Sequence, residues 1–472
     1  MKNYHITICL LIGLFFTTSK AQNKKNILFI CIDDLRPELK SFGADYIISP
    51  NIDALAKKGR PFYNHYVNAP SCGPSRYTML MGTYGPAQND AIFKRAKDIK
   101  QNKAVNLSMP EWFKNNGYTT VSLGKVSHHP GGLGGVDWND PNTIEMPNAW
   151  DKSLIPVKEW QHPRGVMHGL SNGEVRGKVA KSMDVFQSTV GEDTIYPDGH
   201  ITNKAIEQLE NFSKTKKPFF FAVGLIKPHL PFGAPKKYYD RYKNINIPDA
   251  AFSQKPNWPS TWHGSGEFMK YNRWGKDPRA DKGFANEVKK HYAACVTYAD
   301  AQVGRILAKL KETGLDKNTV IVLWGDHGWS LGEHAIWGKH SLFEEALHSP
   351  LIIVDHCVKD KGKGTNAVVE TVDIFPTLCD LTNLSIPDFT IGVSLKPLLK
   401  NVKTKGHNAY AYKRGKKTIR TDRYRLVVSN KGSAELFDHQ EDPYETKNIA
   451  SKHPDVVKEL KELLKQKDLQ RN

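Results

Sequence analysis

The sequence has no long hydrophobic run beyond its first residues, few cysteines, and no repeated or low-complexity segment. No later stretch reaches the ~20 apolar residues that a membrane helix requires, so we expect no membrane span. The six cysteines include no CxxC pair, which argues against a zinc knuckle and against a dense disulfide scaffold. Helix-turn-helix, zinc-finger and RNP-type patterns are missing, so nucleic acid is not an expected partner. The chain of 472 residues is long enough for one large core and a smaller unit.

The N-terminus reads MKNYHITICLLIGLFFTTSKAQ. Lys2 precedes an apolar run from Ile6 to Phe16, and small residues follow at Ser19 and Ala21. This pattern predicts a secretory signal peptide over residues 1–21 and an exported protein, with a buried N-terminal helix as the alternative. Export permits disulfides, but the pairing of Cys31, Cys295, Cys357 and Cys379 stays open at this point.

Basic residues outnumber acidic ones by 67 to 49, which gives a formal net charge of +18. A charge of this sign and size favours a polyanionic partner. For an exported protein, a sulfated or carboxylated polysaccharide fits better than nucleic acid. The alternative is that the surplus charge only keeps the protein soluble.

Apolar runs at 27–32, 118–123, 219–226 and 319–324 predict buried strands, and amphipathic segments between them predict helices. This alternation favours an α/β layered fold around a mostly parallel sheet. Long irregular stretches at 130–200 and 232–285 are interpreted as loops that wall a substrate pocket. From about residue 405, short antiparallel strands and a charged helix predict a C-terminal subdomain. The predicted division is a domain over 22–400 and a subdomain over 401–472.

Polar residues gather where the predicted strands end. They are Asp33 and Asp34, Lys125 and His128, Lys227 and His229, and Asp326 and His327. Ligands of open α/β sheets bind beyond the carboxyl ends of the strands, so these groups are expected to converge. The three aspartates are hard oxygen ligands that suit Ca²⁺ or Mg²⁺ better than zinc. Taken singly, each acid is more often a helix cap or a solvated turn residue.

The segment APSCGPSRYTMLMG contains the pattern Cys-x-Pro-x-Arg, from Cys72 to Arg76. This pattern resembles the signature of the sulfatases of the alkaline phosphatase superfamily, whose cysteine is oxidised to formylglycine, an aldehyde. ILFICIDDLRPEL, GYTTVSLGKVSHHPGG, FFFAVGLIKPHLPF, VLWGDHGWSLGEHAIWGKHSLFEEALHSPLIIV and ELFDHQEDPYETKNIA resemble the iduronate-2-sulfatase branch, in the same order, over roughly residues 25–465. One departure is Met81-Gly82, where the family usually has Thr-Gly.

The resemblance implies a fold and a set of site residues. The fold is an alkaline-phosphatase-like α/β/α sandwich with a mostly parallel central sheet, plus a small C-terminal α+β subdomain with a short antiparallel sheet. The implied ligands of one calcium ion are Asp33, Asp34, Asp326, His327 and the modified Cys72. The implied catalytic residues are Cys72, Arg76, Lys125, His128, His229 and Lys339.

The resemblance also assigns roles to the catalytic residues. Arg76 would orient the hydrated aldehyde made from Cys72, while Lys125 and Lys339 would bind the sulfate oxygens. His128 would assist the hydrate, and His229 would protonate the departing sugar oxygen. One hydroxyl of the hydrate attacks sulfur, and the other then loses its proton and expels sulfate. The nearby His129, His334 and His340 are interpreted as structural or solvated.

The expected function is that of an exported sulfatase that acts on a sulfated glycan, such as a glycosaminoglycan or an algal polysaccharide. A 2-O-sulfate on a uronic acid is the substrate that the resemblance favours. A formylglycine-generating or anaerobic sulfatase-maturating enzyme would convert Cys72, and a bacterial periplasm is the expected location, with secretion as the alternative. Two other functions stay open, namely a phosphodiesterase or phosphonate hydrolase of the same superfamily and a non-catalytic polyanion-binding protein.

Overall fold

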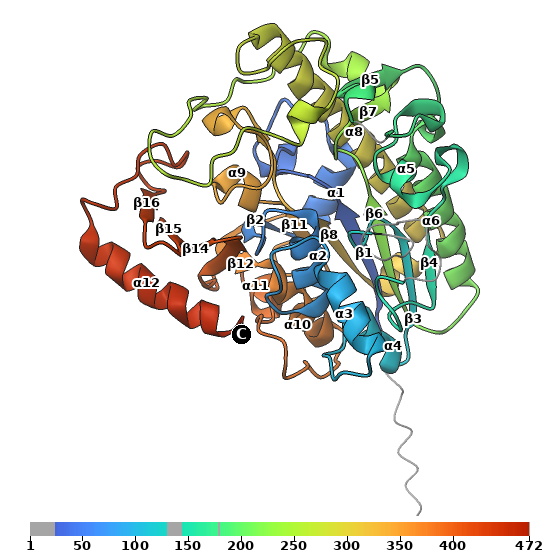
Figure 1. Ribbon diagram of the computed structural model, residues 1–472. Coiled ribbons are helices and arrows are strands. Elements are labelled where there is room, and N and C mark those ends of the chain that lie inside the picture. Colours follow the sequence, from blue (N-terminus) through green and yellow to red (C-terminus); the bar gives the residue numbers. More distant parts are fainter. Residues whose placement is uncertain (1–23, 130–143, 178–179, 472) are drawn as a thin grey trace, which may run out of the picture.

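The computed structural model describes residues 24–129, 144–177 and 180–471. An eight-stranded sheet forms its centre, with strand order β12-β2-β11-β8-β1-β6-β3-β4 (Figure 1). The strands are β1 (Asn26–Ile32), β2 (Arg60–Tyr66), β3 (Thr119–Gly124), β4 (Lys152–Leu154), β6 (Phe219–Leu225), β8 (Thr319–Gly325), β11 (Leu351–Val354) and β12 (Thr365–Glu370). The predicted signal peptide lies outside the described residues.

The sheet is parallel except at one strand. β1 pairs in parallel with β6 and β8, and β3 pairs in parallel with β6 and β4. β11 runs antiparallel to both of its neighbours, β8 and β2. The mostly parallel sheet expected from the sequence is therefore confirmed. The strands β1, β2, β3, β6 and β8 all end at the same edge.

Helices cover both faces of this sheet. The long helices are α1 (Pro50–Lys58), α2 (Cys72–Met81), α3 (Ala91–Lys100), α6 (Pro197–Ser213), α8 (Lys282–Glu312), α10 (Ile374–Leu381) and α12 (Pro454–Leu469), and the short ones are α4 (Met109–Asn115), α5 (Pro163–Met167), α7 (Lys236–Tyr239), α9 (Glu344–Leu347) and α11 (Lys396–Lys400). None of the helices in the described ranges is both long and apolar enough to cross a membrane.

The two faces of β1 show how the layers are built. Leu28, Ile30 and Ile32 pack on the side of α1, α6 and α8, whereas Ile27 and Phe29 pack on the side of α2, α4 and α10. Successive side chains of a strand point to opposite faces, so a continuous apolar run can bury both. The α/β/α sandwich expected from the resemblance is confirmed.

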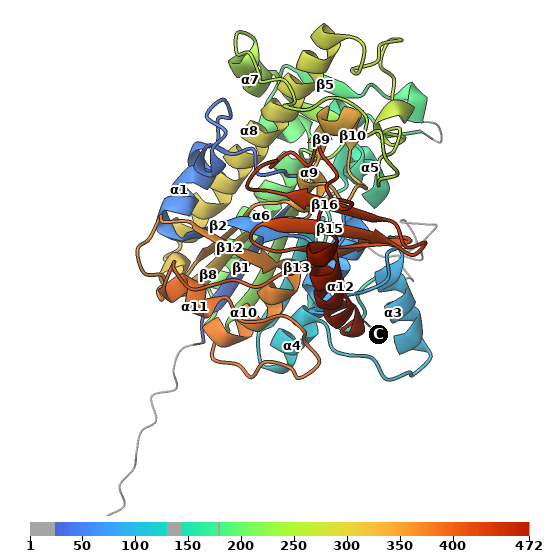
Figure 2. The same cartoon turned by 90° about the vertical axis from the view of Figure 1, so that its left-hand side faces the viewer.

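A second, antiparallel sheet lies toward the C-terminus, with the order β13-β14-β15-β16. Its strands are β13 (Ala409–Lys413), β14 (Lys416–Arg420), β15 (Tyr424–Ser429) and β16 (Ala434–Asp438). Figures 1 and 2 show α12 next to this sheet, and Figure 1 shows it on the opposite side of the molecule from α6. The expected small antiparallel sheet is confirmed, while the exact domain boundary at residue 400 stays a prediction.

The long segments between these elements hold little regular structure. They contain the strands β5 (Phe186–Thr189), β7 (Phe232–Pro235), β9 (Ser330–Leu331) and β10 (Trp337–Gly338), which form two small two-stranded sheets. The five described cysteines form no disulfide, which answers the question that the spacing left open.

Candidate active site

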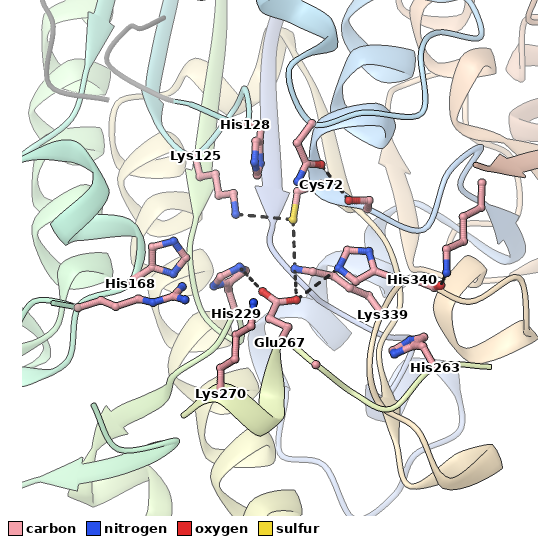
Figure 3. A pocket seen from close by; sticks show the side chains of 15 residues that line it. Cys72, Lys125, His128, His168, His229, His263, Glu267, Lys270, Lys339 and His340 are labelled. Carbon is pink, nitrogen blue, oxygen red and sulfur yellow. Dashed lines mark hydrogen bonds and ion pairs between the residues drawn. The ribbon is translucent and has the colours of Figure 1, made fainter. Parts of the chain in front are cut away.

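The candidate site lies at the edge where the parallel strands end (Figure 3). Asp33 and Asp34 follow β1, Asp326 follows β8, and Lys125 follows β3. β3 approaches β6 closely enough here that a Cβ on Gly224 would lie 2.0 Å from the carbonyl oxygen of Lys125. Position 224 therefore requires a glycine, because the backbone of Lys125, directly after the neighbouring strand, leaves no room for a side chain.

Cys72 is the first residue of α2 and is buried, with 2% of its surface exposed. Its Sγ lies 3.2 Å from Lys339 Nζ, 3.3 Å from His327 Nε2 and 3.8 Å from Lys125 Nζ. Burial raises the pKa of the Cys72 thiol well above its usual range, although the two lysines act to lower it. A thiol in this state is a poor nucleophile, because the thiolate is the reactive form.

The start of α2 is fixed by Asn89. Its Oδ1 accepts hydrogen bonds from the backbone N–H of Gly73 at 3.2 Å and from the Ser71 hydroxyl at 2.9 Å. A Cβ on Gly73 would lie 2.4 Å from Asn89 Cα, so glycine is needed directly after Cys72. Because Cys72 is the first residue of α2, the first turn of this helix lies at the site. The N–H groups of that turn and the helix dipole favour an anion there.

An acidic cluster lies beside Cys72. Ligand atoms of Asp33, Asp34, Cys72 and His327 all lie within 4.8 Å of one another, and all four residues are buried. Asp34 has a φ of 57°, in the left-handed region that aspartate tolerates better than most residues. Burial raises the pKa of Asp34 well above its usual range, and Asp33 and Asp326 add to this effect. Crowded carboxylates of this kind are a site for a cation.

The cluster fits a hard divalent cation by its donor set. Two carboxylates that follow β1 meet one imidazole that follows β8, and oxygen ligands suit Ca²⁺ or Mg²⁺. The His327 Nδ1 lies 2.9 Å from the carbonyl oxygen of Gly328, so Nδ1 is assigned as the donor and Nε2 is left with a lone pair toward Cys72 and Asp34. Burial lowers the pKa of His327 well below its usual range, which keeps the ring neutral and able to act as a ligand.

Asp326 lies at the side of this group, where it also contacts Arg76. Its Oδ1 accepts the backbone N–H of Asp34 at 2.9 Å, and its Oδ2 accepts Arg76 Nε at 3.0 Å. Arg76 also donates to Asp33 Oδ1 at 3.2 Å and to the carbonyl oxygen of Val126 at 3.0 Å. The guanidinium therefore holds two of the acids and the loop after β3. Its predicted role toward the aldehyde stays a prediction.

The two predicted sulfate-binding lysines bracket Cys72. Lys339 Nζ donates to Asp34 Oδ1 at 2.8 Å, and Lys125 Nζ donates to Asp33. Burial alone would lower the pKa of each ammonium, but Asp33 raises the pKa of Lys125 and Asp34 raises that of Lys339. Both side chains are therefore cations next to the sulfur, as binding of a sulfate group requires.

These groups open into a cavity of about 540 Å³. Its lining residues are Ser71, Cys72, Asn89, Lys125, His128, His168, Arg176, His229, His263, Gly266, Glu267, Lys270, Lys339, His340 and Lys413. Among the described residues, five lysine or arginine side chains and one carboxylate line it. The cavity is therefore built for an anionic ligand.

Comparison with known proteins decides the family. The sulfatase family model matches residues 25–384, and a model described as N-sulphoglucosamine sulphohydrolase, C-terminal, matches residues 332–470. This chain belongs to the sulfatase family. It is a sulfuric ester hydrolase, so the resemblance and the enzyme class expected from the sequence are confirmed.

Two relatives and one solved structure show the extent of the likeness. A sulfatase of Formosa agariphila is 31% identical, over 94% of this chain and 87% of that protein. Iduronate 2-sulfatase of Homo sapiens is also 31% identical, over 81% of this chain and 73% of that protein. A structure solved in complex with D-glucosamine-2-N,6-O-disulfate superposes with a TM-score of 0.72 at 23% identity, over 95% of this chain and 98% of that one.

In this sulfatase, His229 follows β6 and lines the cavity. Its Nδ1 lies 2.6 Å from the carbonyl oxygen of Leu230, so Nδ1 is assigned as the donor and Nε2 faces Glu267 Oε1 at 3.8 Å. Burial, with Lys125 beside the ring, lowers the pKa of His229 well below its usual range. His128 lines the cavity next to Lys125, and burial also lowers its pKa.

The placement of three further residues of the sulfatase can be compared with what their sequence positions suggest. Lys227 does not line the cavity, since its Nζ donates to the carbonyl oxygens of Pro231 at 2.5 Å and His229 at 3.4 Å. His340, interpreted from the sequence as structural or solvated, lines the cavity and pairs with Glu267. His334 is structural, because it stacks on Phe343 with ring centroids 4.0 Å apart.

Several residues that line the cavity were not predicted individually from the sequence. His168 and Arg176 come from the irregular stretch 130–200, and His263, Glu267 and Lys270 come from the stretch 232–285. The sequence indicated these stretches as pocket walls, although residues 130–143 and 178–179 lie outside the described ranges. Lys413 comes from β13 in the C-terminal sheet, and no sequence signal pointed to it.

Proposed function

We propose that this sulfatase removes the 2-O-sulfate of a uronic acid in a sulfated oligosaccharide or polysaccharide. In this proposal it uses formylglycine made from Cys72 and one calcium ion. The observation that carries the proposal is the position of Cys72 at the start of α2, between Lys125 and Lys339 and beside the acidic cluster. A buried thiol with a raised pKa has no evident use there as a thiol.

The cations of the cavity support a substrate with more than one anionic group. Lys125 and Lys339 flank Cys72, whereas Arg176, Lys270 and Lys413 line the cavity without any contact to Cys72 among the described residues. A carboxylate on the same sugar or a sulfate on the next one is a suitable partner for the outer cations. The 31% identity to human iduronate 2-sulfatase favours the uronic acid and the 2-O position.

The residues around Cys72 divide the chemistry among them. Asp33, Asp34, Asp326 and His327 would hold the calcium ion, which polarises an oxygen nucleophile and neutralises charge when bound. Lys125 and Lys339 stabilise the charge that develops on the sulfuryl oxygens. His229 turns Nε2 into the cavity, where, once protonated, it would give that proton to the departing sugar oxygen, a step commonly worth about 10²–10⁴-fold.

The predicted maturation and location complete the proposal. Residues 1–21 would direct export, to a bacterial periplasm or to the outside of the cell. A formylglycine-generating or anaerobic sulfatase-maturating enzyme would oxidise Cys72. The formal charge of +18 suits a glycosaminoglycan or an algal polysaccharide as the substrate.

The test is sulfate release from matched oligosaccharides sulfated at the 2-O position of a uronic acid, at the 6-O position of glucosamine, or on an algal galactan. The protein is co-expressed with a formylglycine-generating enzyme, and Cys72→Ala is prepared alongside it. We expect release from the 2-O-sulfated uronate that disappears in Cys72→Ala and after calcium chelation. Release from another substrate alone would contradict the uronate assignment, and faster cleavage of a phosphodiester would contradict sulfatase specialisation.

A further inference from the structure

Within the part of the chain that the structure describes, Glu267 is the single carboxylate that lines the cationic cavity. It directly precedes a 3-10 turn at Phe268–Lys270, and its side chain points into the cavity toward Lys339 and the histidines (Figure 3). Its Oε1 lies 3.8 Å from His229 Nε2, and its Oε2 lies 3.5 Å from His340 Nε2 and 3.7 Å from Lys339 Nζ. It is therefore central to the cavity, close to two of the predicted catalytic residues.

Glu267 is ionised. Burial alone would raise its pKa, but Lys339, followed by His340 and His229, lowers the pKa of this carboxyl well below its usual range. A fixed negative charge repels an anion at a few ångströms and costs affinity for every sulfate or carboxylate that approaches it. Its presence in a cavity built for anions therefore needs a reason other than anion binding.

The position of Glu267 is braced from both sides. Phe268, the next residue, is fully buried. The Ser265 hydroxyl accepts the backbone N–H of Trp337 at 2.8 Å, and the Ser265 carbonyl accepts the N–H of Met269 at 2.9 Å. Trp337 lies two residues before Lys339, so the loops that carry Glu267 and Lys339 are joined to each other. A carboxylate held in this way is positioned for a defined contact.

One oxygen of Glu267 keeps its acceptor capacity. Oε2 is buried and receives no hydrogen bond from any residue in the described ranges. The nearest nitrogens, at 3.5 and 3.7 Å, are ion-pair partners beyond the usual 2.7–3.2 Å range of such hydrogen bonds. Buried acceptors in proteins are nearly always satisfied, so an O–H donor that enters the cavity would complete this one.

We propose that Glu267 is a specificity-determining residue that accepts a hydrogen bond from a free hydroxyl next to the sulfated carbon of the substrate. By the same charge it disfavours a second sulfate at that neighbouring position. This inference rests on the proposed function, because it concerns the same glycan. A site that hydrogen-bonds a substrate hydroxyl discriminates strongly against an analogue that lacks it, since its own polar group is then left unpaired.

The primary test compares wild type and Glu267→Gln on two oligosaccharides that differ only at the carbon next to the scissile sulfate. One carries a free hydroxyl there and the other carries a second sulfate. We expect wild type to prefer the free hydroxyl, and Glu267→Gln to reduce that ratio of kcat/KM by about tenfold or more. Lys270→Gln, three residues away, is the matched control and should lower kcat/KM for both substrates without reducing the ratio. An unchanged ratio in Glu267→Gln would overturn the proposal.

A second pair of substrates tests Glu267 without requiring that the proposed glycan is the substrate. 2-Hydroxy-4-nitrophenyl sulfate carries a hydroxyl next to the sulfate ester, and 4-nitrophenyl sulfate lacks it. We expect Glu267→Gln to lower kcat/KM about tenfold on the first and about twofold or less on the second. Equal losses on both would mean that Glu267 acts only through Lys339 or His229, which overturns the inference. Turnover of both aryl sulfates with none of the uronate would instead overturn the proposed function, while the aryl pair still decides the role of Glu267.

Discussion

Three clusters in the described ranges of this sulfatase bring two carboxylates and an imidazole within 4.8 Å of one another, and two of these clusters differ clearly in their surroundings. The open cluster, Asp33, Asp34 and His327 with Cys72, lies at the edge of the large sheet beside the cavity. The closed cluster, Glu370, Asp373 and His407, lies between the large sheet and the C-terminal sheet. Residue types alone do not separate the two.

The closed cluster is satisfied by its own chain. Asp373 Oδ2 accepts His407 Nε2 at 2.7 Å and the N–H of Glu370 at 2.8 Å. Glu370 Oε2 pairs with Lys467 of α12 at 2.6 Å, and Glu370 Oε1 accepts the Tyr84 hydroxyl at 2.9 Å. Each carboxylate thus has a cation and further donors from the protein. Its role is to fasten the C-terminal subdomain to the large sheet.

The lysines that pair with the open cluster also line the cavity. Lys125 and Lys339 each pair with one aspartate and also lie within 4 Å of Cys72 at the cavity. Burial raises the pKa of Asp34, and Lys339, which acts to lower it, does not offset this effect. The two clusters therefore differ in what balances their negative charge. In the closed cluster the protein balances it, whereas in the open cluster part of it is left for a ligand to balance. Each of the following changes tests one part of this difference.

The largest expected effect is on activity when the open cluster loses a charge. Asp34→Asn should lower kcat by at least about 10³-fold, because the proposed calcium ion would lose a ligand. The free energy of unfolding in the presence of a chelator should change by less than about 1 kcal/mol, since neutralising Asp34 also relieves repulsion among the acids. Sulfate release and urea unfolding measure the two effects. Activity within tenfold of wild type would contradict the assignment of Asp34.

The next effect separates the inner from the outer cations of the cavity. Lys339→Met should lower kcat/KM by about 10²-fold, because the ammonium next to Cys72 stabilises charge on the sulfuryl group. Lys413→Met, at the C-terminal side of the cavity, should lower it only about threefold. Steady-state kinetics on one substrate compare the two variants. Equal losses would show that the inner position has no special role.

The closed cluster should respond in the opposite way. Asp373→Asn should destabilise the protein by about 2 kcal/mol, because His407 and two backbone donors lose a charged acceptor. Per folded molecule, kcat should not change. Asp380→Asn, whose carboxylate pairs with Lys396 near the surface, is the control and should cost less than about 1 kcal/mol. A loss of kcat in folded Asp373→Asn would remove the distinction between the clusters.

The smallest effect is a pH dependence of the closed cluster. Burial alone would lower the pKa of His407, but Asp373 and Glu370 raise it from 6.5 to about 9. Because the folded pKa lies above the unfolded one, this stabilisation is complete below pH 6.5 and is lost as the pH rises toward 9. Wild type should exceed His407→Gln in stability by about 1 kcal/mol at pH 6 and should lose that margin near pH 9.5. A margin that does not change over this interval would rule out the charged His407.

The sequence predicted those parts of the fold that depend on the pattern of residues within one segment. The apolar run of β1 and the capped helix α4, where Ser108 and Glu111 form a capping box, are local patterns. The antiparallel direction of β11 is not local, because it depends on how the chain returns to pair with β2 and β8. The direction of β11 was therefore known only from the structure.

The site was predictable to the same degree. Asp33, Asp34, Cys72 and His327 were expected together because they follow strands or a recognised motif, and the structure brings them within 4.8 Å. Glu267 lies in an irregular loop and Lys413 in another sheet, so only tertiary contacts bring them to the cavity. Lys227 shows the reverse case, since its position after a strand suggested the site while its ammonium binds backbone carbonyls.

The central claim is that hydrolysis depends on conversion of Cys72, and one measurement tests it most directly. The unmutated chain is produced with and without a formylglycine-generating enzyme, the fraction of converted Cys72 is determined by peptide mass spectrometry, and sulfate release is measured for each preparation. The rate of sulfate release should rise in proportion to the converted fraction of Cys72 and should vanish when no Cys72 is converted. Equal rates in converted and unconverted protein would contradict it.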